Sequence, residues 1–295
     1  MGHDHEGQRV SRRRLFAGIS SIGLGTLLAA CSDSGTSAVT TSTGATVTPQ
    51  ATTATTGDLS ALFEGANTCE LTATTTQGPY YFDADKVRGD IREDRQGVRL
   101  RVAIKVQDSE TCAPLKNAVV EIWHCDAAGL YSGAESLSTG GGGNPPGNGS
   151  PPPSGPPTGA PPSGGPGGGG GEDDGSMDLT PTDDKRYLRG AQVTNAEGIV
   201  EFTTIWPGWY RGRTIHIHAM VHVSNERVLT TQMMFDEKLN SVVMAKAPYS
   251  AHTGRDTFND GDTIYQDGML MKVSAEGDGY VGAIVFSADS DKDGT

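Results

Sequence analysis

Residues 98–106 read VRLRVAIKV, and apolar side chains stand at every second position of this stretch. These positions, whose neighbours are mostly polar, are Val98, Leu100, Val102, Ile104 and Val106. Successive side chains of a strand point to opposite faces, so a period of two predicts a β-strand with one buried face. The stretch therefore indicates a sheet that covers a hydrophobic core.

Further segments of the chain have the short apolar pattern of strands, and turn-forming residues separate most of them. The expected strands are residues 118–123, 199–205, 215–223, 228–235, 269–273 and 280–286. No convincing amphipathic helix is visible between them. Several short strands joined by polar turns predict an all-β fold, an antiparallel β-sandwich with long loops.

Low-complexity tracts limit the part of the chain that can form a core. The 295 residues include 41 glycines and 16 prolines, which are concentrated in a few stretches. Residues 32–58 are almost all Ser, Thr, Ala and Gly and predict a flexible tether. Residues 140–175 predict a disordered Gly/Pro-rich insertion in a surface loop. We therefore expect one domain over residues 59–288, followed by an acidic tail at 289–295.

The N-terminus has the order of features of a bacterial export signal. Three arginines at 12–14 precede a short apolar run at 19–28, and Cys31 follows that run. The first part resembles a twin-arginine signal, and the second resembles a lipobox whose cysteine is lipidated. Residues 1–31 are therefore expected to export the protein as a periplasmic or cell-surface lipoprotein on the extracellular face. Its only membrane attachment is then the lipid anchor; the alternative is a stray basic segment with a free cysteine.

The charge of the chain bears on its partners. The formal net charge is -13, with Lys+Arg 23 against Asp+Glu 36. Neutralising the phosphates of a nucleic acid needs a basic face. We therefore expect no nucleic-acid partner.

The cysteines predict one disulfide. With Cys31 assigned to the lipobox, three cysteines remain in an exported domain, where disulfides persist. Cys125 ends an apolar run and lies six residues before Tyr131, so a buried free thiol suits it better. Cys69 and Cys112 lie in polar segments, and we predict that they pair.

Residues 204–223, TIWPGWYRGRTIHIHAMVHV, combine a strand pattern with groups that can bind a metal. His216 and His218 share one face of the expected strand, whereas His222 lies roughly 13 Å beyond His218 on that face. Imidazole accepts zinc, copper, nickel or iron, but the phenol of Tyr210 requires a strongly acidic cation such as ferric iron. The histidine pair alone is a weak signal, and a polar strand face is its alternative.

Several motifs resemble, in their order along the chain, those of the intradiol ring-cleavage dioxygenases, the family of catechol 1,2-dioxygenase and protocatechuate 3,4-dioxygenase. They are GPYY at 78–81, PLKNAVVEIWHCDAAGLYS at 114–132, LRG at 188–190, PGWY at 207–210, RTIHIH at 213–218 and LTTQ at 229–232. The resemblance covers about residues 69–287 apart from the insertion.

The resemblance implies a non-haem ferric ion, Fe(3+), held by two tyrosinates and two histidines. The matching residues are Tyr131, Tyr210, His216 and His218. Considered singly, each tyrosine has a simpler explanation, namely a packed ring in a loop or a hydrogen-bonded phenol at a sheet edge. Their joint occurrence in the family's order favours the metal site.

Further site residues follow from the same resemblance. Arg213 matches the active-site arginine and Gln232 a polar pocket residue, with a surface ion pair and an exposed strand position as their alternatives. Pro79 and Tyr80 match the mouth of the pocket, with core packing as the alternative. His124 and His252 are expected to be structural.

The implied reaction is the cleavage of a catechol-type aromatic by O2 to a cis,cis-muconate-type diacid. Tyr210 would leave the metal and act as a base, and Arg213 would stabilise negative charge on the ring. The competing hypothesis is a lipid-anchored β-sandwich that binds a glycan or a partner protein. In that case the metal site is vestigial or holds zinc, and exposed aromatics such as Trp209 make the contact.

Overall fold

The computed structural model describes residues 39–40, 46–47, 62–64, 69–138 and 178–292. The expected export signal with Cys31, the insertion at 140–175 and most of the tether lie outside these residues. Within the tether, β1 (Val39–Thr40) and β2 (Thr46–Val47) pair as a short antiparallel ladder. Among the helices of the described ranges, none is long and apolar enough to cross a membrane.

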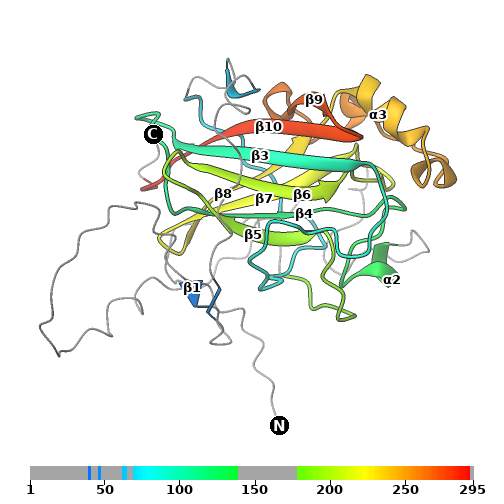
Figure 1. Ribbon diagram of the computed structural model, residues 1–295, viewed down its shortest axis with the longest axis horizontal. Coiled ribbons are helices and arrows are strands. Elements are labelled where there is room, and N and C mark those ends of the chain that lie inside the picture. The colour runs from blue at the N-terminus through cyan, green and yellow to red at the C-terminus, as the bar shows by residue number, and fades with distance from the viewer. Residues whose placement is uncertain (1–38, 41–45, 48–61, 65–68, 139–177, 293–295) are drawn as a thin grey trace, which may run out of the picture.

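Two four-stranded sheets form the domain (Figure 1). Their strand orders are β6-β3-β10-β9 and β5-β4-β7-β8. The strands are β3 (Arg99–Asp108), β4 (Val119–Trp123), β5 (Arg189–Val193), β6 (Ile199–Ile205), β7 (His216–Val223), β8 (Glu226–Met234), β9 (Lys272–Glu276) and β10 (Gly279–Ala288). The predicted all-β sandwich is confirmed, and its strand pairs are antiparallel except β3 with β10, which run parallel.

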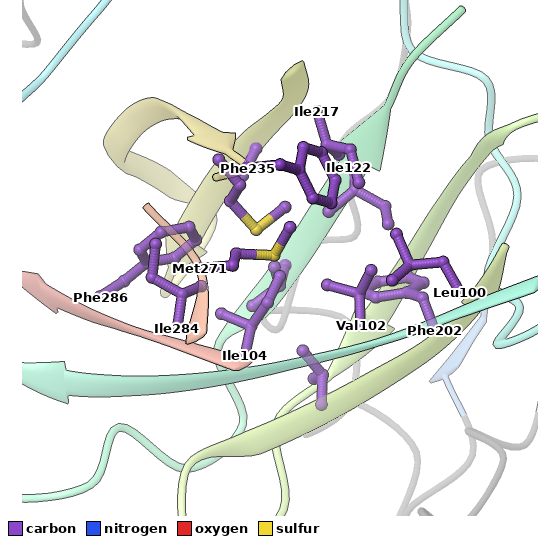
Figure 2. Packing of buried hydrophobic residues seen from close by; sticks show 14 of the residues in the cluster. Leu100, Val102, Ile104, Ile122, Phe202, Ile217, Phe235, Met271, Ile284 and Phe286 are labelled. Carbon is purple, nitrogen blue, oxygen red and sulfur yellow. The ribbon is translucent and has the colours of Figure 1, made fainter. Parts of the chain in front are cut away.

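The stretch at 98–106 forms most of β3, and its burial follows the period of two except at Ala103, which is also buried. Arg101 and Lys105 remain partly exposed. The intervening apolar side chains are 0% exposed: Leu100, Val102, Ile104 and Val106. They pack between the sheets against residues of other strands and loops, including Ile122, Phe202, Ile217, Phe235, Met271, Ile284 and Phe286 (Figure 2). Each fully buried aliphatic or aromatic side chain contributes about 1.5–3 kcal/mol to folding.

Some elements differ from the sequence-based expectation. Strand β5 was not predicted, because RGAQV has too few apolar residues to show a period. The expectation of no amphipathic helix is wrong: α3 (Glu237–Met244) buries Asn240 and Val243, and the Asp236 side chain caps its N-terminus. Eight residues are too few for a helical period to stand out. The other short helices are α2 (Glu135–Ser138), η2 (Tyr249–Ala251), η3 (Asn259–Gly261) and η4 (Asp267–Met269).

Strand β7 separates the main core from the candidate site. Ile217, Ala219 and Val221 belong to the core between the sheets. The alternate residues of β7 face the opposite side, where Met220 joins a second apolar cluster with Tyr81, Trp123, Cys125, Tyr131 and Ala134. This outer face of the sheet β5-β4-β7-β8 is covered by loops, and it holds the residues that the sequence selects.

One disulfide ties the start of the domain to the turn after β3. Cys69 and Cys112 are bonded, with 5.3 Å between their Cα atoms, and this is the pair that the sequence predicts. Cys125 is a buried free thiol, as expected.

Candidate metal centre

A single cross-strand row organises the site. Arg189 on β5 lies opposite Trp123 on β4, Trp123 opposite His218 on β7, and His218 opposite Gln232 on β8. The Trp123 and His218 rings stack with 5.0 Å between centroids and 4° between planes. The row fixes the position of His218 in the middle of a rigid sheet.

The two histidines of β7 direct one nitrogen each toward the same point. His216 Nδ1 donates a hydrogen bond to the Thr214 carbonyl oxygen at 2.6 Å, so in the neutral ring Nε2 carries the lone pair. The Nε2 atoms of His216 and His218 are 3.1 Å apart. Both side chains are 2% exposed. The pair therefore presents Nε2 atoms in a site that excludes most water.

Tyr210 approaches the pair from the turn before β7. Its hydroxyl oxygen lies 3.2 Å from His216 Nε2. The turn depends on Gly208, because a Cβ there would lie 2.3 Å from the Asp126 carbonyl oxygen. In the sequence PGWY, the close approach of two loops thus brings the Tyr210 phenol to the histidines. Tyr210 remains partly exposed.

Tyr131 closes the group from the loop after β4. Its side chain is 0% exposed, and its hydroxyl has no hydrogen-bond partner. The Tyr131 ring lies 5.7 Å from the Tyr210 ring and 6.4 Å from the His218 ring, centroid to centroid. A buried hydroxyl without a partner is costly, and a bound cation would satisfy it.

The electrostatics of the group suit a cation. Burial, together with the charge of Arg213, lowers the pKa of His216 to about 3. Burial and the neighbouring His216 lower the pKa of His218 as well, so both imidazoles are neutral, the form that binds metals. Burial raises the pKa of Tyr131 and of Tyr210. The phenols therefore ionise only for a strongly acidic ion, and the donor set fits ferric iron.

Cysteine and carboxylate ligands are not part of this group. Within the described ranges, no three His, Cys, Asp or Glu side chains gather to hold a metal ion. The candidate site takes half of its donors from tyrosine instead, which favours a hard trivalent cation over zinc.

Arg213 and Gln232 lie together beside the histidines. Arg213 Nη2 donates to Gln232 Oε1, and Arg213 Nε donates to Asp262 Oδ2 at 2.9 Å. Gln232 is 0% exposed, which excludes the exposed strand position. Arg213 is therefore held between a buried amide and a buried carboxylate rather than in a surface ion pair.

Asp262 was missed by the sequence analysis. It also accepts a hydrogen bond from the Thr214 backbone N–H at 2.7 Å, and Thr214 in turn accepts from His216. One carboxylate thus orients both Arg213 and the peptide that supports a histidine. No motif marks it, because it lies in a polar segment 44 residues after His218.

The two residues expected at the pocket mouth differ in burial. Pro79 is exposed, and Tyr80 is partly buried. The Tyr80 ring stacks on Tyr131 with 4.7 Å between centroids. Gly78 has φ +74° and lies so close to His218 that a Cβ would be 2.9 Å from Cε1 of the imidazole. Residues 78–80 thus form a wall of the site.

The other histidines of the described residues lie apart from the group. His124 Nδ1 donates to the Cys125 carbonyl oxygen at 2.8 Å, and the Thr204 hydroxyl lies 2.7 Å from His124 Nε2, so both nitrogens are satisfied. His252 stacks on Trp209 at 4.1 Å. His222 lies opposite Val119, at the other end of β7.

Comparison with known proteins shows to which solved structures the chain is similar. An intradiol ring-cleavage dioxygenase from Tetranychus urticae is 29% identical, with 75% of this chain and 96% of that chain covered and a TM-score of 0.60. A second dioxygenase structure is 28% identical, with 75% and 95% covered and a TM-score of 0.60. No protein-family model and no curated protein matches the chain.

The fold and the site are thus similar to those of solved intradiol ring-cleavage dioxygenases, at 28–29% identity. The resemblance to this family that the sequence motifs indicate is confirmed by these two solved structures.

Proposed function

We propose that the protein cleaves a catechol-type aromatic between its two hydroxylated carbons, consuming O2 and giving a cis,cis-muconate-type diacid. The proposal rests on one observation above all: two imidazole Nε2 atoms and two phenols converge on the outer face of the sheet. Tyr131, Tyr210, His216 and His218 would hold a ferric ion. When bound, that ion would acidify the catechol oxygens and withdraw electron density from the ring.

The protein's own residues have distinct tasks in this reaction. Tyr210 is the partly exposed member of the group, so it is the phenol that an entering catechol can displace and that can take up a substrate proton. Tyr131 is fully buried and stays in place. Arg213, fixed by Asp262 and Gln232, offers a positive charge that does not need to reorganise when negative charge develops on the ring.

The residue named for the alternative of a binding protein is buried. That alternative gave Trp209 as an example of an exposed aromatic, but Trp209 is 6% exposed and its ring stacks on His252. Its indole N–H also donates to the His252 carbonyl oxygen at 3.1 Å. This residue supports the turn before Tyr210 rather than a docking surface.

Colour, metal content and oxygen uptake test the proposal together. We expect purified protein to be red to burgundy, with about one iron per chain, because tyrosinate bound to ferric iron absorbs visible light. Oxygen uptake with catechol, hydroxyquinol and protocatechuate, with product identification by NMR, then gives the substrate. Protein that stays colourless and inactive after ferric loading, or that is active with zinc alone, contradicts the proposal.

A further inference from the structure

Arg189, the first residue of β5, is a buried charge to which the proposed reaction assigns no task. It is 1% exposed, and among the described residues no carboxylate lies within ion-pair distance of it, although the buried Glu121 interacts with its charge at longer range. Burying a charge without a direct ion pair costs free energy. An arginine in such a position therefore points to a specific role.

The guanidinium joins two segments that line the metal centre. Nη2 donates to the Tyr80 carbonyl oxygen at 2.7 Å and to the Ser132 carbonyl oxygen at 2.9 Å. Nε donates to Ser132 Oγ at 3.0 Å. Tyr80 and Tyr131 are the stacked pair of the site, and Ser132 follows Tyr131 in the chain. The forked guanidinium of Arg189 thus holds the backbone of Tyr80 and the backbone next to Tyr131.

The guanidinium of Arg189 also lies beside two aromatic rings. Its carbon lies 4.1 Å from the centre of the Phe82 ring and 5.9 Å from that of Tyr131. Nη1 is buried without a hydrogen-bond partner. A planar, permanently charged fork suits this position, whereas an ammonium group cannot reproduce its geometry.

We propose that Arg189 is a positioning residue of the metal centre: its fork sets the Tyr80–Tyr131 stack, and thereby the placement of the Tyr131 oxygen. The inference rests on the proposed function, since it concerns Tyr131 as a metal ligand. It extends the site to the edge strand β5, at the end of the row that contains Trp123, His218 and Gln232.

Arg189→Lys and Arg189→Gln test this inference. In both variants we expect about 10–100-fold weaker iron affinity, the usual effect of losing a group that orients a ligand. We also expect a shifted tyrosinate absorption band, a larger fall in kcat than rise in KM, and an altered near-UV circular dichroism spectrum of the metal-free protein. All are measured well below the melting temperature, where loss of stability alone moves none of them.

Arg186→Gln is the matched control. Its guanidinium lies 4.8 Å from the centre of the same Phe82 ring, but donates to the Asp183 and Lys185 carbonyl oxygens of its own loop. Iron affinity and the absorption band should stay within about twofold of the wild type. An equal effect of Arg186→Gln and Arg189→Gln would overturn the inference.

The outcomes separate this inference from the proposed function. Wild-type protein without iron, colour or activity contradicts the proposed function, whereas a coloured, active wild type that Arg189→Lys matches in every readout contradicts only the inference. If neither Arg189 variant folds, Ser132→Ala decides, because it removes one acceptor of the fork and keeps the backbone carbonyl. A smaller shift in the same direction supports the inference, and behaviour identical to the wild type overturns it.

Discussion

Tyr131 and Tyr210 place the same phenol group in different surroundings. Tyr131 is fully buried with an unpartnered hydroxyl, while Tyr210 is partly exposed and lies beside His216 Nε2. Burial raises the pKa of both phenols, so each depends on a cation to ionise. The difference in access suggests that one phenol anchors the metal permanently and the other exchanges with substrate.

Phenylalanine substitutions should separate these two tasks. We expect Tyr131→Phe to lose iron and colour. Its iron affinity should fall by more than the roughly 10–100-fold that loss of a group orienting a ligand costs. Tyr210→Phe should keep part of its iron but lower turnover by roughly 10²–10⁴-fold, the contribution of a positioned general base. Metal analysis and stopped-flow absorbance measure both. Equal and complete iron retention in the two variants would contradict the ligand assignment.

At the scale of elements, β4 carries a buried acid next to the site. Glu121 accepts a hydrogen bond from the Tyr81 hydroxyl at 3.2 Å, on the face that Trp123 shares. Burial, reinforced by the charge of Asp83, raises the pKa of Glu121 from 4.5 to about 8. The folded protein therefore binds this proton more tightly than the unfolded chain, so the contribution of Glu121 to the free energy of unfolding falls as pH rises from about 4.5 to about 8, while the buried histidines contribute with the opposite sign at acidic pH.

Glu121→Gln should remove this dependence, because the amide keeps the acceptor but cannot ionise. We expect the variant to be more stable than the wild type at pH 8, by on the order of a few kcal/mol, and similar at pH 5. Urea unfolding across this pH range measures the difference. Glu197→Gln, in an exposed turn, is the control and should leave the slope unchanged. Parallel curves for the wild type and Glu121→Gln would refute the prediction.

At the scale of the molecule, the disulfide closes the domain. Cys69 and Cys112 are 43 residues apart in sequence, so their bond restricts the unfolded chain. We also propose, from the N-terminal motifs alone, that the protein is exported and anchored through Cys31. Disulfides persist in such a compartment, which is consistent with this location.

Replacing both bonded cysteines by serine should lower the free energy of unfolding by about 2–4 kcal/mol. For a domain of this size the melting temperature should then fall by roughly 5–15 °C. Differential scanning calorimetry of the Cys69→Ser/Cys112→Ser variant measures both. Cys69→Ser alone serves as the control, because it breaks the same bond and should lose as much stability. An unchanged melting temperature in the double variant would show that the bond does not stabilise the domain.

The sequence by itself determined the β-class, the core face of β3 and the identity of the donor groups. The first two follow from a local property, the period of two in residues 98–106, whereas the candidate donor groups follow from the resemblance of the motifs to a known family. The motif order placed His216, His218, Tyr210 and Tyr131 in one candidate group without any coordinate.

Only the tertiary structure decided which distant residues support that group. Asp262 reaches Arg213 across a 49-residue separation, and Arg189 reaches Tyr80 across 109 residues. The parallel pairing of β3 with β10 likewise joins the two ends of the domain. Such contacts depend on how strands pack and on which loops cover a sheet, and no local period in the chain records them.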